Sequence, residues 1–98
     1  MNRNMIRQMQ QLQAKILKTQ EELGQETVEG TAGGGAVRIV MTGHQKVQSV
    51  TIDPEAAEDV ELLQDLLVTA FNDAQEKVAA LVARRMGPLT GGLGLPGL

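Results

Sequence analysis

The chain has 98 residues, of which 42% are hydrophobic, and a formal net charge of −3 at pH 7. A chain of this length has room for one modest core, so we expect a single domain that gains further burial from a partner. Cysteine is absent, which excludes disulfides and thiolate metal sites. Phe71 is the only aromatic residue, so the core is expected to consist of aliphatic residues and methionine.

Residues 2–23 are predicted to form an amphipathic helix that stops at Gly24. Apolar residues recur every three or four positions, which is the spacing of a heptad seam with one polar slot. The seam residues are Met5, Met9, Leu12, Ile16, Thr19 and Leu23. The intervening basic and glutamine residues break any continuous apolar run. We therefore expect neither a signal peptide nor a membrane span, and we predict a cytoplasmic protein.

Between residues 25 and 53 the apolar residues alternate and β-branched side chains become frequent, which predicts three antiparallel strands. Glycines 33–35 separate the first two strands, and residues 43–46 separate the last two. The alternation predicts one apolar face that must be covered. The opposite face carries Arg38, Gln48 and Thr51 toward solvent or a second subunit. No Lys-Ser/Thr pair or helix start follows the glycine run, so we interpret it as a strand connector.

Asp53 and Pro54 are typical of a helix start, and a short turn is expected at residues 54–58. Asp59 then caps a long apolar-striped helix that is predicted to run to Met86, about 42 Å at ~1.5 Å per residue. Such a helix is longer than a strand of about 17–24 Å, so its second half must protrude beside the N-terminal helix. Residues 87–98 are uncharged and rich in Gly and Pro, which predicts a disordered tail after a single domain spanning residues 1–86.

Charge is strongly segregated along the chain. Residues 1–18 hold four basic and no acidic residues, residues 19–76 hold two basic and twelve acidic, and residues 77–98 hold three basic and none acidic. The first helix runs toward the predicted sheet and the last helix runs away from it. Both basic segments are therefore expected at one distal end of the molecule, and the acidic residues are expected at the other end.

A positive tip of this kind suits contact with the phosphates of double-stranded DNA. The candidate DNA-binding residues are Arg3, Arg7, Lys15, Lys18, Lys77, Arg84 and Arg85. A purely structural role is an alternative for Arg84 and Arg85, because cations at a helix C-terminus complement its dipole. That explanation fails for Arg3 and Arg7, which lie near a helix N-terminus, although a merely solvated face remains an alternative there.

Other candidate sites are weaker. His44 is the only histidine, and no Cys, Ser or carboxylate cluster stands at ligand spacing from it, so we interpret it as an exposed turn residue. The acidic residues between 53 and 61 are explained by the preference of helix starts for acids. No nucleophile and base pair stands out. The sequence predicts no enzyme, no metal and no cofactor.

Taken together, the motifs resemble those of the YbaB/EbfC family of nucleoid-associated proteins over nearly the whole chain. The matching segments are residues 5–23, 37–43, 50–54, 63–74 and 91–98. Two departures are the acidic overall balance and the small Ala56 and Ala57 after Asp53-Pro54, where relatives often carry larger apolar residues.

The resemblance implies a dimeric α+β fold with a long N-terminal helix, a three-stranded antiparallel sheet, a short turn and a long C-terminal helix. It also implies protruding helical arms shaped like tweezers, which bind DNA in the bacterial nucleoid. We therefore predict a homodimeric nucleoid-associated protein that binds the DNA backbone with little sequence specificity. The alternative is a protein–protein interaction module that uses the helical seam or the exposed sheet face to recruit a protein partner.

Overall fold

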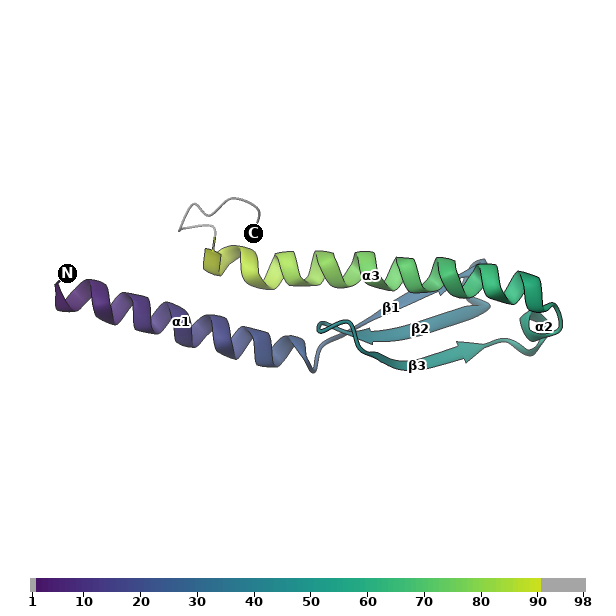
Figure 1. The fold of residues 1–98 in the computed structure, drawn as a ribbon, viewed down its shortest axis with the longest axis horizontal. Coiled ribbons are helices and arrows are strands. Elements are labelled where there is room, and N and C mark those ends of the chain that lie inside the picture. The colour runs from purple at the N-terminus through teal and green to yellow at the C-terminus, as the bar shows by residue number, and fades with distance from the viewer. Residues whose placement is uncertain (1, 91–98) are drawn as a thin grey trace.

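The computed structural model describes residues 2–90 and has the predicted α+β architecture (Figure 1). One long helix covers a small sheet and continues past it, and the other projects from that same end, in an elongated molecule of 66 × 23 × 15 Å. The elements are α1 (Arg3–Leu23), β1 (Thr27–Ala32), the 3₁₀ turn η1 (Gly33–Gly35), β2 (Val37–Thr42), β3 (Val47–Ile52), α2 (Pro54–Ala57) and α3 (Val60–Thr90).

Local signals in the sequence fix where these elements begin. The Asn2 side chain accepts a hydrogen bond of 2.8 Å from the Met5 amide and caps α1. Asp59 accepts one of 3.1 Å from the Leu62 amide, which confirms its predicted role as the cap of α3. The three glycines of η1 all have positive φ, between 63° and 96°, so this run connects β1 to β2 through a conformation that other residues rarely adopt.

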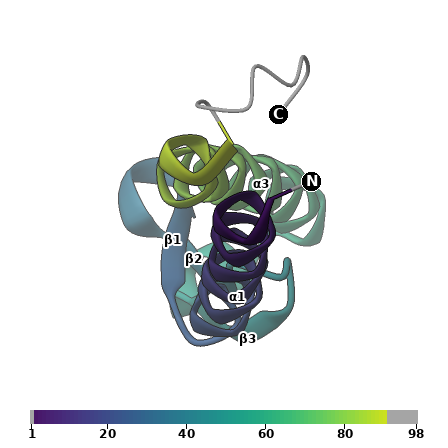
Figure 2. The same ribbon diagram turned by 90° about the vertical axis from the view of Figure 1, so that its left-hand side faces the viewer.

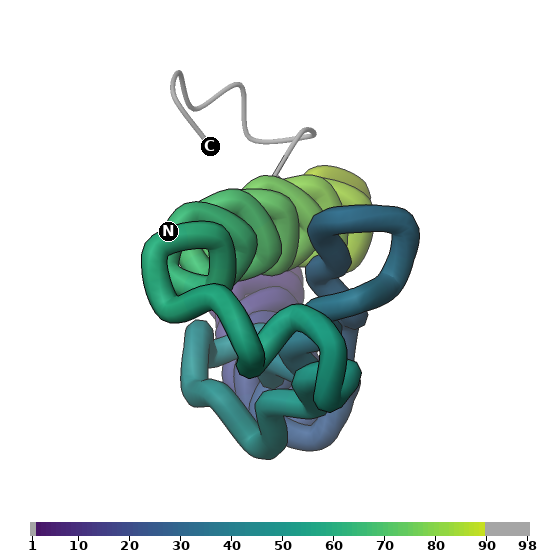
Figure 3. Tube along the Cα trace, turned by 90° about the vertical axis from the view of Figure 1, so that its right-hand side faces the viewer, coloured from purple at the N-terminus to yellow at the C-terminus, as the bar shows by residue number. Residues whose placement is uncertain are grey.

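The strands form one antiparallel sheet in the order β1-β2-β3. A register shift between Val40 and Met41 brings both Val47 and Val50 of β3 opposite inward-facing residues of β2. The helix α3 lies on one side of this sheet, as the two end views show (Figures 2 and 3). The core between them is aliphatic and includes a methionine, as the composition predicts. Its buried members are Ala32, Val37, Ile39, Met41, Ala70, Ala74 and Val78.

The contact between β1 and α3 is unusually close at Gly30. A Cβ atom at this position would lie 2.2 Å from the carbonyl oxygen of Ala70 and 2.5 Å from the amide nitrogen of Ala74. Both are backbone atoms of α3, so the helix axis can approach the strand this closely only because Gly30 has no side chain. The small Ala70 and Ala74, both fully buried, complete the same contact.

The third strand is not covered by α3. Val47 and Val50 are 44% and 47% exposed, although they lie on the face that α3 covers over β1 and β2. A single helix is about 10 Å wide, whereas three strands spaced about 4.8 Å apart present a broader face. On α3 beside β3, Val68 and Phe71 are also exposed. We call Val47, Val50, Val68 and Phe71 the open apolar face, which borders a groove of about 370 Å³.

The last helix ends later than the sequence predicts, at Thr90 rather than Met86. Gly87 costs a helix about 1 kcal/mol relative to Ala, and Pro88 removes one backbone hydrogen bond near the end of α3, where few bonds remain to be lost. The helix therefore continues through both residues for one more turn. The remainder of the predicted tail, residues 91–98, lies outside the described residues.

The close contact at Gly30 predicts that Gly30→Ala destabilises the protein. The added methyl group must push backbone atoms of α3 away, and overpacking of this kind costs about 1–3 kcal/mol. Denaturant unfolding followed by circular dichroism measures the loss. The control is Gly87→Ala, where nothing lies within 4 Å of the new Cβ and stability should not fall. Equal stability of Gly30→Ala and the parent chain would contradict the packing described.

Candidate nucleic-acid interface

The two basic segments lie at the same end of the molecule. The start of α1 and the end of α3 project together away from the sheet, and α1 reaches farther (Figure 1). The end view in Figure 2 places α1 nearest the viewer with α3 alongside. This is the arrangement that chain direction and charge segregation predict. We call α1 together with residues 77–90 of α3 the arm.

Five of the seven candidate cations are exposed and have no hydrogen bond or ion pair within residues 2–90. We call them the free cations. They are Arg3, Arg7, Lys15, Lys18 and Arg84. No acidic residue lies within four positions of Arg3, Arg7, Lys15 or Arg84, whereas Lys18 is followed by Glu21 and Glu22 one turn later.

Four of the free cations form a stripe along α1. At 3.6 residues per turn, Arg3, Arg7, Lys15 and Lys18 fall within a sector of about 120°, and the middle of the apolar seam is roughly 140° away. The seam faces the rest of the protein near the sheet, where Leu23 is buried and Leu12, Ile16 and Thr19 are half-buried. The basic stripe therefore faces solvent along α1, whereas only the second half of the seam packs and Met5 and Met9 stay exposed.

The sixth candidate, Arg85, is held inside the protomer. Its guanidinium forms an ion pair and hydrogen bond with Glu22 at the end of α1, and a second ion pair of 2.8 Å with Glu26. The hydrogen bond to Glu22 raises the pKa of Arg85. The Glu26 Oε2 atom is shielded from solvent and has no other partner among the described residues. Arg85 thus fastens the arm portion of α3 to the C-terminal end of α1.

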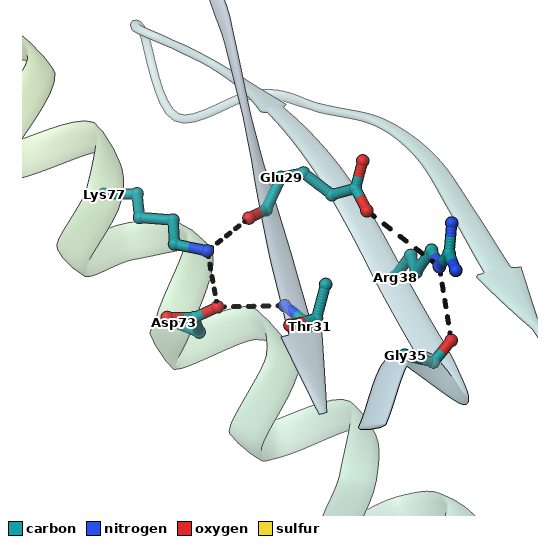
Figure 4. Close-up of polar contacts among 6 residues, drawn as sticks. All are labelled: Glu29, Thr31, Gly35, Arg38, Asp73 and Lys77. Carbon is teal, nitrogen blue, oxygen red and sulfur yellow. Dashed lines mark hydrogen bonds and ion pairs between the residues drawn. The ribbon is translucent and has the colours of Figure 1, made fainter. Parts of the chain in front are cut away.

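The seventh candidate, Lys77, belongs to a polar contact at the free edge of β1 (Figure 4). Its ammonium donates a 2.8 Å hydrogen bond to the Glu29 carbonyl and lies 3.0 Å from the Asp73 carboxylate. Asp73 in turn accepts a 2.9 Å hydrogen bond from the Thr31 amide, and this bond lowers the pKa of Asp73. Asp73 and Lys77 therefore satisfy backbone groups of an edge strand that would otherwise be open to pairing with another chain.

The end of the molecule opposite the arm carries the acidic residues between 53 and 61 and shows no metal-binding geometry. Within residues 2–90, no group of three or more His, Asp or Glu side chains could hold a metal ion.

His44 is exposed in the β2–β3 turn, as predicted, and its ring Nε2 lies 2.6 Å from the Gln20 carbonyl oxygen. Since a carbonyl can only accept, the ring donates this hydrogen bond and ties the turn to α1. Within the described helices, no segment is both long and apolar enough to cross a membrane.

Comparison with known proteins assigns the family. A sequence model of the YbaB/EbfC DNA-binding family matches residues 1–93. The chain belongs to the YbaB/EbfC DNA-binding family. It is 55% identical over 96 residues to a nucleoid-associated protein of Chloroflexus aurantiacus, covering 95% of this chain and 96% of that protein. It is also 55% identical to a nucleoid-associated protein of Desulforamulus reducens, covering 96% of this chain and 91% of that protein.

The fold of this YbaB/EbfC chain also has a solved counterpart. An uncharacterized protein of Helicobacter pylori superposes with a TM-score of 0.75, covering 95% of this chain and 98% of that one. The two are 21% identical, so the likeness concerns the fold alone. It shows that this arrangement of helices and sheet also occurs in a distant sequence.

Two features of this YbaB/EbfC chain were not found by sequence reasoning. The open apolar face went unnoticed because alternation in β3 does not show which strand a helix will cover. The local roles of Lys77 and Arg85 were also missed. Asp73 and Lys77 have the i, i+4 spacing of a helix ion pair, which was a usable signal. The pairing of Arg85 with Glu22 spans 63 residues and left no signal in the sequence.

The adjacent Arg84 and Arg85 give a matched test of whether Arg85 fastens the two helices while Arg84 has no structural role. Arg85→Ala should lower the thermal unfolding midpoint and speed amide exchange in the last turn of α1, because it leaves a shielded Glu26 oxygen without its charge partner. Arg84→Ala removes the same charge from an exposed side chain and should change neither quantity. Similar effects of the two variants on stability would contradict the assignment of Arg85 as the fastening residue.

Proposed function

We propose that the protein is a homodimeric nucleoid-associated protein that binds double-stranded DNA through the free cations of its arms, with little sequence specificity. The observation that carries this proposal is the gathering, on one projecting arm, of five exposed cations that have no partner among residues 2–90, in a chain whose net charge is −3. Membership of a DNA-binding family supports the same partner.

The dimensions of the basic stripe favour the DNA backbone as its target. From Arg3 to Lys18 the stripe is about 22 Å long at ~1.5 Å per residue. That length matches about six base pairs of duplex, which carry about 12 phosphates. Contacts between long flexible cationic side chains and phosphates give affinity and position without reading bases. Lys77 and Arg85 have a smaller part in this proposal, since both are already engaged within the protomer.

The open apolar face supports the homodimer. Val47, Val50, Val68 and Phe71 leave apolar side chains from β3 and α3 exposed side by side around one groove. Exposed patches of this kind mark interaction sites, and small chains gain needed burial by association. A second copy covering this face would leave both arms projecting, so that one dimer presents two basic stripes to DNA.

Removing cations from the arm should weaken DNA binding more than removing them elsewhere. Arg3→Gln with Arg7→Gln deletes two phosphate contacts per arm. We expect a steep loss of gel retardation and a salt dependence of log K that is shallower by about 2 per arm. The control, Arg38→Gln with Lys46→Gln, changes net charge equally but lies on the sheet and its turn. Equal losses in the two variants would show that overall charge, not the arm, governs binding.

The same titration separates DNA binding from the alternative of a protein-interaction module. Affinity through phosphates must fall steeply between low and moderate salt, whereas an apolar interface is nearly insensitive to salt. Failure to retard random-sequence duplexes even at low salt would favour the interaction module, and retardation that moderate salt leaves unchanged would contradict binding through phosphates.

The homodimer is tested by placing a charge on the open apolar face. Val68→Glu should halve the molar mass measured by sedimentation, because a buried unpaired carboxylate is costly at an interface. Val68 is 61% exposed in the protomer, so the substitution should leave the fold intact. The control is Leu62→Glu, a half-exposed site on another side of α3. A dimer that persists in Val68→Glu would place the interface elsewhere.

A further inference from the structure

A second apolar groove lies where the arm joins the sheet, between the end of α1, the β2–β3 turn and α3. Its volume is about 730 Å³, and we call it the fork groove. The residues of its apolar wall are Leu23, Val78, Ala79, Val82, Ala83 and Met86. None of the free cations lines it, so it is not part of the basic stripe that we propose for DNA.

We propose that residues 91–98 of the same chain fold back from the end of α3 and seat their leucines in the fork groove. This inference goes beyond DNA binding and does not depend on it. The occupant follows from three properties of the chain beyond Thr90: where it starts, how far it reaches and what it is made of.

The segment starts beside the groove. Gly87 is the last residue of α3 that lines the fork groove, and Gly91 follows four positions later, about 6 Å along the helix axis. Gly91 and Gly92 allow the chain to reverse direction, because glycine adopts conformations that other residues avoid. The segment is therefore tethered at the mouth of the groove, which gives it an effective concentration in the millimolar range.

The segment is also long enough and chemically suited. Ala79 lies eleven residues before Thr90, about 17 Å along α3, and the seven residues from Gly91 to Gly97 can span about 23 Å. Residues 91–98 carry no charge and include Leu93, Leu95 and Leu98, which match an apolar wall. A nucleic acid or a charged peptide would find no countercharge there.

Docking would place apolar side chains between α1 and α3 where the arm joins the sheet. Arg85 already joins α3 to the end of α1 next to this groove, and leucines packed beside Leu23 and Val82 would hold the two helices at a fixed separation. The two contacts, one polar and one apolar, would then set how the basic stripe is presented.

Disulfide trapping tests the proposal, since the chain has no cysteine of its own. Ala79→Cys with Gly97→Cys retains every leucine and places one thiol in the groove. The control is Ala80→Cys with Gly97→Cys. Ala80 is also exposed and is closer to the tether, but it does not line the groove. Under mild oxidation we expect the Ala79 pair to close at least about fivefold faster within one chain, because docking raises the local concentration beyond that of a free tether.

Replacing Leu93 and Leu95 with Ser in both pairs should abolish the difference, and circular dichroism of each variant checks that the fold is retained. Equal closure rates in the parent pairs would overturn the proposal. A disulfide that joins two chains, visible as a covalent dimer on a non-reducing gel, would also overturn it by assigning the groove to the partner's segment.

Discussion

The close approach of α3 to β1 at Gly30 is the constraint on which the other contacts depend. Because this strand residue has no side chain, the helix backbone rests directly on the strand, with Ala70 and Ala74 fully buried around it. On the same stretch of α3, Asp73 and Lys77 bond to the free edge of the same strand. Apolar and polar contacts thus fix both the position and the direction of α3 relative to the sheet.

That fixed direction gives the second half of α3 its place beside α1. The helix is longer than the strands it covers, so its last turns leave the sheet and meet the end of the N-terminal helix. Arg85 bridges Glu22 and Glu26 at this point. The neighbouring Arg84 stays exposed. Adjacent arginines therefore divide between fastening the arm and presenting charge, and the acidic residues near the junction neutralise the cation that does the fastening.

Periodicity and caps were sufficient to predict the two long helices and the three strands within residues 2–90, because each of these elements carries its own local signal. The short turn expected at residues 54–58 forms the four-residue helix α2. Charge segregation combined with chain direction also predicted that the basic segments share one end. Contacts between distant residues were beyond such reasoning: nothing near Arg85 in sequence indicates Glu22, and the pattern of β3 does not reveal that α3 is too narrow to cover it. The end of α3 was missed because Gly87 and Pro88 break helices in their interior more strongly than in the last turn.

The central proposal is that DNA contacts the exposed cations of the arm and does not contact the acidic end of the molecule around residues 53–61. The most direct measurement is an NMR titration of the ¹⁵N-labelled full chain with a short duplex of arbitrary sequence. We expect shift changes along residues 3–18 and around Arg84, fading as salt is raised, with residues 47–61 unaffected. Changes centred on the outward face of the sheet, with α1 silent, would contradict the account.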